Sequence, residues 1–187
     1  MQDVVITGTG IYNPPHVITN AELVEAFNAY AALQNERHAD RIATGEVQPM
    51  VTSSVEFIEK ASGIKQRFVI DKQGVLDPTR MRPHFEPRSD EQLSLMAEIA
   101  VAAAEQALKA AGRTGAEVDA VLCSAANMQR AYPAMAIEIQ QAIGAKGYGF
   151  DMNVACSSAT FAIEQAANAI RCGTARRVLV VNPEITS

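Results

Sequence analysis

The chain has 187 residues, of which 48% are hydrophobic and 20% are charged, with a formal net charge of -5. This composition suits a folded domain with a sizeable core, and its mild acidity gives no basic stripe for nucleic acid or anionic lipid. No apolar run reaches the roughly 18 residues of a membrane span, and the N-terminus lacks the regions of a signal peptide. We therefore expect a cytoplasmic protein.

The N-terminal segment begins with a predicted buried strand over residues 3–9, which runs into a turn at Gly8–Gly10. Pro14 and Pro15 then keep the following loop out of a helix. The sequence Thr19-Asn20-Ala21-Glu22 is a capping box, and it predicts a helix over about residues 20–30.

A second capping signal lies at Ser53–Glu56, and it predicts a short helix that Gly63 ends. The next segment, residues 64–70, alternates and is rich enough in β-branched residues to predict a strand. This part of the chain therefore carries one helix and one strand after the first helix.

The rest of the chain alternates helices with strands. Its longest predicted helix is Ala-rich and periodic, begins at Ser89 and ends at Ala111, before Gly112. The later elements are a strand over 118–124, a helix over 134–143, a strand over 148–154, a helix over about 156–172 and a strand over 177–182. Buried strands that alternate with helices predict an α/β fold, a mostly parallel sheet with helices on both faces.

Two stretches interrupt this alternation. Residues 31–52 are polar and weakly periodic, and residues 71–88 contain Pro78, Pro83 and Pro87 among charged side chains. Long irregular segments of compact domains lie at the surface and are commonly functional or mobile. We interpret both as surface insertions, and solvated loops without a function of their own are favoured over binding loops.

Cysteine chemistry is the first candidate for function. Cys123, Cys156 and Cys172 are spaced too widely for a CxxC metal clip, and the histidines form no ligand cluster with them, so no metal site is predicted. Cys123 lies within a predicted strand, and we interpret it as a core residue. Cys172 lies at the end of its helix, where the negative end of the helix dipole disfavours a thiolate.

Cys156 stands where an apolar strand ends, small residues turn and an amphipathic helix begins. A thiol at a helix N-terminus faces unpaired backbone N–H groups and the positive end of the dipole, and both favour the nucleophilic thiolate. Small neighbours let a substrate reach the sulfur and free the Cys156 N–H for an oxyanion hole. From this pattern alone, a packed structural thiol is an equal alternative.

Two other motifs are weaker. Gly8-Thr9-Gly10 follows a strand, but Asn13 stands where a dinucleotide-binding GxGxxG motif requires its third glycine. We interpret these glycines as a tight turn where chains approach closely. Each of the three histidines, His16, His38 and His84, is expected in a loop or insertion as a surface residue.

Several segments, in order and at matching spacing, resemble β-ketoacyl-acyl carrier protein synthase III, a thiolase-superfamily enzyme that starts fatty-acid chains. The opening Val5–Pro14 and the following Thr19–Leu23 are similar to the start of that family, and Ser62–Arg67 is similar to its "TGIxxR" segment. Tyr132-Pro133-Ala134 also falls in register, and the segment around Cys156 matches the family's active-site cysteine. The resemblance implies the N-terminal half of a thiolase-like layered fold, incomplete in this chain.

The resemblance also implies a mechanism. An acyl group passes from acyl-CoA to Cys156, and malonyl-acyl carrier protein then loses carbon dioxide and condenses with the thioester to give a 3-oxoacyl product. The family uses a histidine and an asparagine for the second step, and both lie in a second half of the fold beyond residue 187. The resemblance therefore implies a fragment of an acyltransferase, no cofactor besides the substrate acyl-CoA, and a homodimer.

The chain departs from the family at several positions. The family places a tryptophan and an arginine where they hold CoA, and Phe57 and Ala61 stand at these positions. Phe57 can still stack on the adenine, whereas Ala61 removes a cation. Ser157-Ser158 replaces the usual Ala-Gly, and Tyr132 matches an aromatic residue that limits acyl-chain length in the partner's pocket. These departures indicate a divergent member with altered acyl or donor preference.

Proteins with other functions would carry the same sequence features. Another thiolase relative, such as a hydroxymethylglutaryl-CoA synthase or a secondary-metabolite condensing enzyme, would share Cys156 and differ in second-half residues. A non-catalytic binding protein on the same fold would keep an inert thiol. Acylation of Cys156 by acyl-CoA separates the enzymes from the binding protein.

Overall fold

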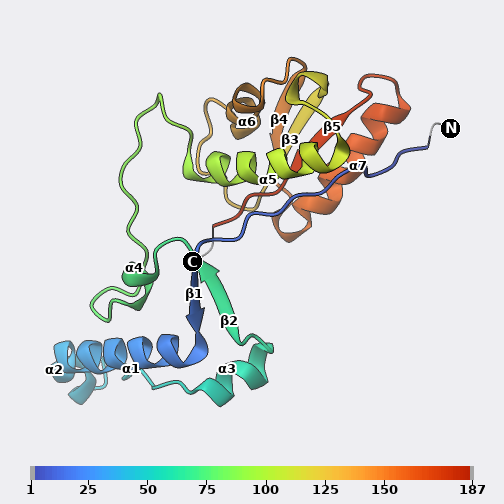
Figure 1. Cartoon of the computed structure of the whole chain (residues 1–187). Coiled ribbons are helices and arrows are strands. Elements are labelled where there is room, and N and C mark those ends of the chain that lie inside the picture. Colours follow the sequence, from blue (N-terminus) through green and yellow to red (C-terminus); the bar gives the residue numbers. More distant parts are fainter. Residues whose placement is uncertain (1–2, 186–187) are drawn as a thin grey trace. The chain divides into compact units, whose positions relative to one another are not determined.

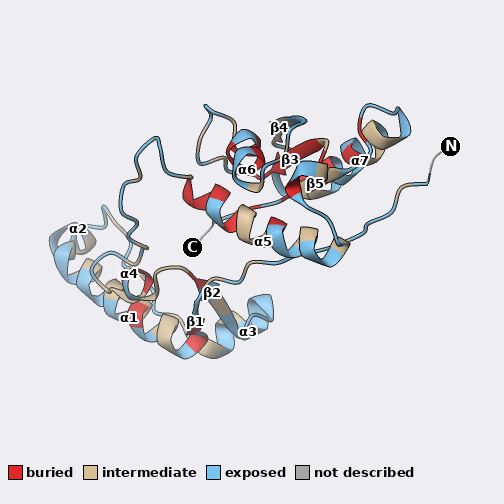
Figure 2. Ribbon diagram, turned by 45° about the horizontal axis from the view of Figure 1, so that its top comes forward, coloured by how far each residue is buried: buried red, intermediate tan, exposed pale blue. Residues whose placement is uncertain are grey.

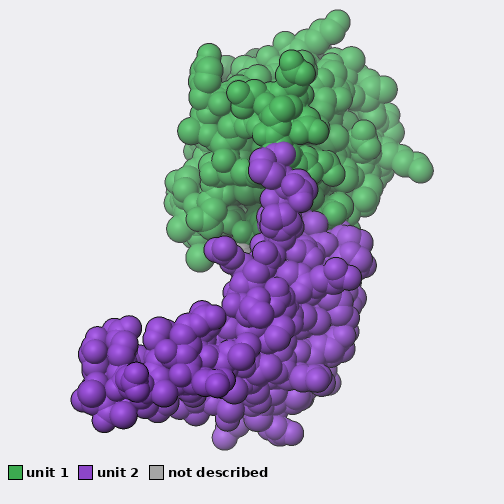
Figure 3. All heavy atoms as spheres, turned by 90° about the vertical axis from the view of Figure 1, so that its left-hand side faces the viewer, with its two compact units in different colours: residues 1–12, 88–186 green, residues 13–87, 187 purple. Residues whose placement is uncertain are grey.

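The computed structural model describes residues 3–185, and these residues divide into two compact units (Figure 3). Unit 1 consists of residues 3–12 and 88–185, and unit 2 consists of residues 13–87. Within residues 3–185, no helix is both long and apolar enough to cross a bilayer. The described part of the chain thus forms two compact units, each with its own core.

Unit 2 is built on a two-stranded antiparallel sheet of β1 (His16–Thr19) and β2 (Gln66–Val69). Its small core gathers around Ile18, Val69 and Val75. Its helices, coloured blue to green in Figure 1, are α1 (Asn20–Arg37), α2 (Ala39–Ala43), α3 (Val55–Ser62) and α4 (Lys72–Leu76).

The capping signals of unit 2 are confirmed. The Thr19 hydroxyl accepts a hydrogen bond from the Glu22 backbone N–H, and the Glu22 carboxylate accepts one from the Thr19 N–H at 2.9 Å. Gly63 ends α3 in the left-handed conformation, with a φ of 71°. The strand predicted over 64–70 is present as β2.

Several predictions for unit 2 are wrong. The first helix does not end near residue 30 but continues to Arg37, because no glycine or proline interrupts it. The two stretches predicted as irregular contain the short helices α2 and α4. The Asn28 and Asn35 side chains, through hydrogen bonds to backbone groups of Ser53 and Met50, hold the segment after α2 along α1. The strand β1 was not predicted, since its pairing with β2 is a non-local contact.

Unit 1 contains a parallel three-stranded sheet in the order β4-β3-β5 (Figure 1). Its strands are β3 (Ala120–Ser124), β4 (Tyr148–Met152) and β5 (Val178–Val181), and its helices are α5 (Leu95–Ala111), α6 (Met135–Ile143) and α7 (Ser158–Arg171). The predicted α/β class, with a parallel sheet, is confirmed.

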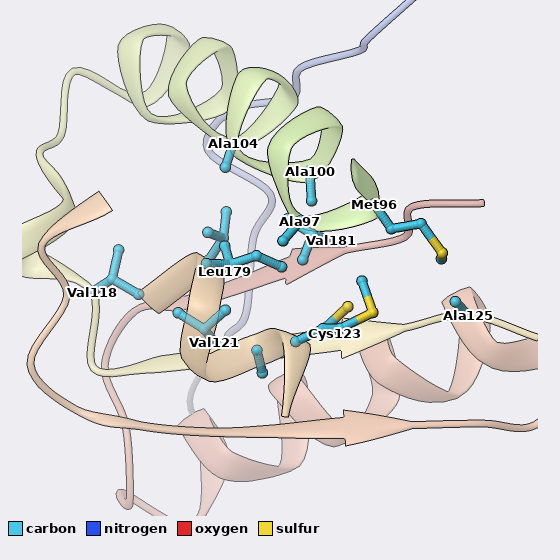
Figure 4. Close-up of a cluster of buried hydrophobic side chains, with 13 residues drawn as sticks. Met96, Ala97, Ala100, Ala104, Val118, Val121, Cys123, Ala125, Leu179 and Val181 are labelled. Carbon is cyan, nitrogen blue, oxygen red and sulfur yellow. The ribbon is translucent and has the colours of Figure 1, made fainter. Parts of the chain in front are cut away.

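The core of unit 1 lies between this sheet and the helices α5 and α6, and the buried residues concentrate in β3 and the helix faces against it (Figure 2). Val121 and Cys123 of β3 point to this side, where they meet Leu179 and Val181 of β5 and the alanines of α5 (Figure 4). Successive strand residues face opposite sides, so Leu122 faces the side that α7 covers through Ala169.

The strand predicted over residues 3–9 is not formed. This segment is extended, but a strand needs a neighbour to share its backbone hydrogen bonds, and none pairs with it among the described residues. It lies instead along α5, and Val5 and Ile6 stay exposed. A Cβ atom at Gly10 would come within 2.0 Å of the Ala103 carbonyl oxygen, so the predicted close approach of these glycines is confirmed, whereas the predicted tight turn at residues 8–10 does not form.

The long helix of unit 1 begins later than predicted. Ser89 opens only a turn, whereas Ser94 is the true N-cap, and its hydroxyl accepts a hydrogen bond from the Ala97 N–H. Ser94 is buried, and both its backbone N–H and its hydroxyl donate hydrogen bonds to the Glu138 carboxylate of α6. That tertiary contact selects Ser94 over Ser89. Gly112 ends the helix as predicted.

The start of the sheet depends on Asp119, and we predict that its contribution to stability is lost in acid. Its carboxylate accepts hydrogen bonds from the Arg176 N–H at 2.8 Å and the Arg177 N–H at 2.9 Å, and these bonds, the Arg176 bond first, hold the pKa of Asp119 below its ordinary 3.8. Since the folded state prefers the ionised group, the stabilisation is present above pH 3.8 and disappears as the pH falls through the lower folded-state pKa.

Asp119→Asn is therefore expected to lower the melting temperature at neutral pH and to have a smaller effect below pH 3.8. Melting temperatures of both proteins, measured by circular dichroism across this range, test the prediction. A difference between the two proteins that does not change with pH would show that the Asp119 carboxylate makes no such contribution.

Candidate active site

Cys156 lies at the edge of the sheet where the parallel strands end. It follows the carboxyl end of β4, while residues 125–134 leave the carboxyl end of β3 and Asn182 follows β5. Ligands of open parallel sheets bind outside this edge, where successive loops meet. The predicted nucleophile therefore occupies the position in unit 1 that is most often used for chemistry.

A tight turn holds Cys156 between β4 and α7. Ala155 has a φ of 47°, a left-handed conformation that non-glycine residues rarely adopt. The Asn153 side chain accepts a hydrogen bond from the Ala155 N–H at 3.0 Å, and Ser158 Oγ accepts one from the Val154 N–H at 2.8 Å and donates one to the Ala155 carbonyl at 2.7 Å. These bonds stabilise a strained turn that presents the thiol outward.

The helix after Cys156 begins slightly later than predicted. Residues Ala155–Ser157 form a single 3₁₀ turn, and α7 begins at Ser158. Cys156 therefore stands just before the N-terminus of a 14-residue helix, close to the positive end of its dipole. Ser158 stands where the resembled family usually has glycine. It is buried, and its hydroxyl closes the turn by a hydrogen bond to the Ala155 carbonyl.

The environments of the three thiols differ. Cys156 and Cys172 are exposed, whereas Cys123 is buried within β3. Burial, with smaller effects of the Asp151 and Glu138 carboxylates, raises the pKa of Cys123 to about 12. Within residues 3–185, the backbone N–H of Cys156 has no protein acceptor, so it is available to an oxygen bound beside the sulfur.

We predict that Cys156 is alkylated first among the three thiols. It combines exposure with a helix N-terminus, whereas Cys172 is exposed at a helix C-terminus and Cys123 is neither exposed nor readily ionised. Iodoacetamide labelling of the folded protein, followed by peptide mass spectrometry, gives the order. Labelling of Cys172 before Cys156 would show that the helix dipole does not govern reactivity here.

Tyr132 lies on the loop between β3 and α6 and is 92% exposed. The start of this loop is tied to the Cys156 turn, because Asn153 Nδ2 donates a hydrogen bond to the Ala126 carbonyl at 2.8 Å. The Glu184 carboxylate accepts a second hydrogen bond, at 2.9 Å, from the Ala126 N–H. Unit 1 thus connects the loop that carries Tyr132 with the turn that carries Cys156.

The other predicted site residues belong to unit 2. Phe57 lies on α3 with an exposed ring, which leaves its face free to stack on a flat ligand. Of the histidines, His16 lies in β1 rather than in a loop, His38 lies between α1 and α2, and His84 contacts Glu86. Unit 1 thus contains Cys156 and Tyr132, whereas Phe57 and the three histidines belong to unit 2. In the described residues, no cluster of three metal-ligating side chains occurs.

Sequence analysis missed the residues that hold this site in shape. Asn153, Asp151 and Glu184 form hydrogen bonds with backbone groups of the Tyr132 loop and the first turn of α6. Glu138 and Arg130 form an ion pair in which the Glu138 side chain is only 5% exposed. Asn153 and Glu184 are polar residues that follow the ends of strands, which is a weak signal. Nothing in the sequence identifies the partners of Asp151, Glu138 or Arg130.

A comparison with protein families matches residues 150–187, which include Cys156, to the family described as 3-oxoacyl-[acyl-carrier-protein (ACP)] synthase III. The chain is 54% identical over 162 residues to a β-ketodecanoyl-[acyl-carrier-protein] synthase of Pseudomonas aeruginosa, a match that covers 87% of the chain and 46% of that protein. It is 30% identical over 188 residues to a β-ketoacyl-[acyl-carrier-protein] synthase III of Granulibacter bethesdensis, covering all of the chain and 45% of that protein.

Among solved structures, the chain is similar to 3-oxoacyl-[acyl-carrier-protein] synthase III from Aquifex aeolicus, with a TM-score of 0.67 and 25% identity. This match covers 95% of the chain and 43% of that structure. The chain thus spans about half the length of the curated relatives and the solved structure that it matches.

Proposed function

The chain is a relative of the β-ketoacyl-[acyl-carrier-protein] synthase III enzymes of the thiolase superfamily, and on this premise we propose that it carries the acyl-accepting half of a fatty-acid condensing enzyme. The observation that carries the proposal is the exposed Cys156 on its strained turn before α7, within the matched residues 150–187. A polypeptide that joins this chain to a second half like that of the relatives is called the complete protein.

In the first step, the Cys156 thiolate attacks the thioester carbonyl of acyl-CoA. The carbonyl oxygen becomes negative, and the Cys156 N–H and the N-terminus of α7 stabilise this charge. The bond from the carbonyl carbon to the CoA sulfur then breaks, CoA leaves as a thiolate that takes up a proton, and the acyl group stays on Cys156 as a thioester.

In the second step, malonyl-acyl carrier protein loses carbon dioxide, and the electron pair of the broken bond remains on the carbon next to its thioester. This carbanion attacks the acyl carbonyl on Cys156, and the bond to sulfur breaks. The products are a 3-oxoacyl-acyl carrier protein and a free Cys156 thiolate. The histidine and asparagine that synthase III enzymes use for this step belong, by the resemblance, to the second half of the complete protein.

The name of the Pseudomonas aeruginosa relative suggests the length of the acyl group. That protein is named for a β-ketodecanoyl product, and decarboxylative condensation lengthens the primer by the two carbons of the malonyl unit that remain. An octanoyl primer is therefore the substrate that we assign to this chain. By the resemblance, we assign Phe57 to stacking on the adenine of CoA, and we assign Tyr132 to limiting the length of the acyl chain.

The proposal is tested by giving the complete protein malonyl-acyl carrier protein and a series of acyl-CoA primers from acetyl to dodecanoyl. We expect β-ketodecanoyl-acyl carrier protein from octanoyl-CoA, together with stoichiometric release of carbon dioxide. If Cys156 is acylated but no carbon dioxide is released, and the acyl-enzyme condenses with acetyl-CoA instead of malonyl-acyl carrier protein, the result would support a hydroxymethylglutaryl-CoA synthase type of reaction. Absence of any acyl-enzyme would support a non-catalytic binding protein.

The proposal includes a homodimer in the cytoplasm, the compartment that supplies acyl-CoA and acyl carrier protein. Strand β4 lies at the edge of its sheet and exposes Tyr148 and Phe150, while Tyr132 is also exposed. An unpaired edge with aromatic side chains favours pairing with a second copy.

We predict that the complete protein sediments as a dimer at micromolar concentration and that Phe150→Lys shifts it toward the monomer, because a lysine opposes the burial of this edge. Phe85→Lys, which changes an exposed aromatic residue of unit 2, is the matched control. A monomer in the wild-type protein would contradict this part of the proposal.

A further inference from the structure

Glu138 of α6 is a buried carboxylate that the proposed mechanism does not use. Its side chain is 5% exposed, and it accepts hydrogen bonds from the Ser94 N–H at 2.8 Å, the Ser94 hydroxyl at 2.9 Å and Arg130 Nη1 at 3.1 Å. A buried charge is costly unless it is paired and fully hydrogen-bonded. Glu138 meets this requirement with groups from other segments of the chain, so its main consequence is to fix these segments relative to α6.

One of these segments is the loop that carries Tyr132. Arg130 stands two positions before Tyr132, and its side chain is only 18% exposed where it meets Glu138. The neighbouring Gln129 side chain accepts a hydrogen bond from the Met96 N–H at 2.9 Å, in the first turn of α5. Gln129 is therefore fixed on the first turn of α5 and Arg130 on Glu138 of α6, although Tyr132 itself is exposed.

The other side of Tyr132 is fixed by a second carboxylate. Asp151 of β4 accepts hydrogen bonds from the Met135 N–H at 2.8 Å and the Ala136 N–H at 2.7 Å, which fixes the first turn of α6. Asp151 belongs to the strand that leads into the Cys156 turn. Tyr132 thus projects from a short span of chain between two fixed points, one on α5 and one on the strand of the nucleophile.

We propose that the Arg130–Glu138 ion pair is a positioning device that sets the place of Tyr132 and thereby the acyl-chain length that the enzyme accepts. The inference rests on the proposed function, in which Tyr132 limits the acyl pocket. Guanidinium groups form directional, charge-assisted hydrogen bonds with carboxylates, so the pair holds the loop more firmly than a neutral side chain would. Without the pair, Tyr132 has more than one position, and acyl chains longer than octanoyl are accepted.

The test uses the complete protein with Arg130→Met, which keeps much of the length of the side chain and removes the charge. We expect the preference for octanoyl-CoA over dodecanoyl-CoA, as the ratio of kcat/KM values, to fall by about tenfold. The rate of Cys156 alkylation by iodoacetamide is expected to stay unchanged, because the turn of the nucleophile is held by Asn153 and Ser158. Arg130→Lys is expected to restore part of the preference.

Arg113→Met is the matched control, since Arg113 forms an exposed ion pair with Glu117 in the same unit. Hydrogen exchange of the peptide that contains residues 129–134 is measured in parallel, and we expect it to increase in Arg130→Met but not in Arg113→Met. An unchanged octanoyl preference in folded Arg130→Met protein overturns the inference. If the wild-type protein forms no acyl-enzyme, the proposed function fails instead of this inference. In that case the positioning role is judged by hydrogen exchange alone, and an unchanged exchange rate of residues 129–134 in Arg130→Met overturns it.

Discussion

Replacing Cys156 with alanine is expected to lower the condensation rate of the complete protein by at least about a thousandfold, because in the proposed mechanism Cys156 holds the acyl chain between the two steps. The alternative acceptors in unit 1 are poor ones. Cys123 is buried with a pKa raised to about 12, and Cys172 stands at the C-terminus of α7. The measurement is β-ketoacyl product formed from octanoyl-CoA and malonyl-acyl carrier protein.

Cys172→Ala is the matched control for this experiment. It removes an exposed thiol of the same unit without touching the turn of Cys156, so its rate is expected to equal that of the wild type. A Cys156→Ala protein with a rate within about tenfold of the wild type would show that acyl transfer does not pass through this residue.

Truncation of Ile139 to alanine is expected to have the largest effect on stability, a loss of about 2–5 kcal/mol in the free energy of unfolding. Ile139 is 0% exposed and belongs to the core cluster between α5, α6 and the sheet. Removing its outer methyl groups takes away buried apolar contacts and leaves a cavity that the surrounding helices and strand fill only in part.

Ile137 provides the control, because it lies on the same helix but is 40% exposed. Ile137→Ala is expected to cost less than about 1 kcal/mol. Urea unfolding of both variants of the complete protein, with equal slopes against urea concentration, gives the comparison. Equal losses at the two positions would contradict the assignment of the core to this face of α6.

The parts of the fold that depend on neighbouring residues could be predicted from the sequence. The capping box at Thr19 and Glu22 and the stops at Gly63 and Gly112 act within one helical turn, so the chemistry of a few residues specifies them. The order of strands and helices from β3 to β5 could also be predicted, because each strand is a short, largely apolar run between helical segments.

The predictions that failed depend on distant partners. Residues 3–9 have the composition of a strand, but no strand pairs with them in the described residues, whereas β1 forms because β2 lies beside it. Ser89 and Ser94 are both good N-cap residues, and the choice between them is made by Glu138, which lies 44 positions away from Ser94 in the chain. Local preference is overruled by such contacts.

In the candidate site, too, the features that depend on neighbouring residues could be predicted and those that depend on distant contacts could not. Cys156 became a candidate because the strand, the small residues and the helix that define its position are contiguous, and the resemblance to synthase III then favoured a nucleophile over a structural thiol. The pairing of Arg130 with Glu138 was not found, since a glutamate on a helix normally indicates a solvated face. Only the packing of α6 against α5 and the sheet shows that this carboxylate is buried.

The central claim is that Cys156 accepts an acyl group, and the most direct test is the mass of the complete protein after brief exposure to octanoyl-CoA. We predict one added octanoyl group, located on the peptide that contains Cys156 and removed by hydroxylamine, as expected of a thioester. An unmodified protein, or an octanoyl group on the peptide of Cys172 instead, would contradict the claim.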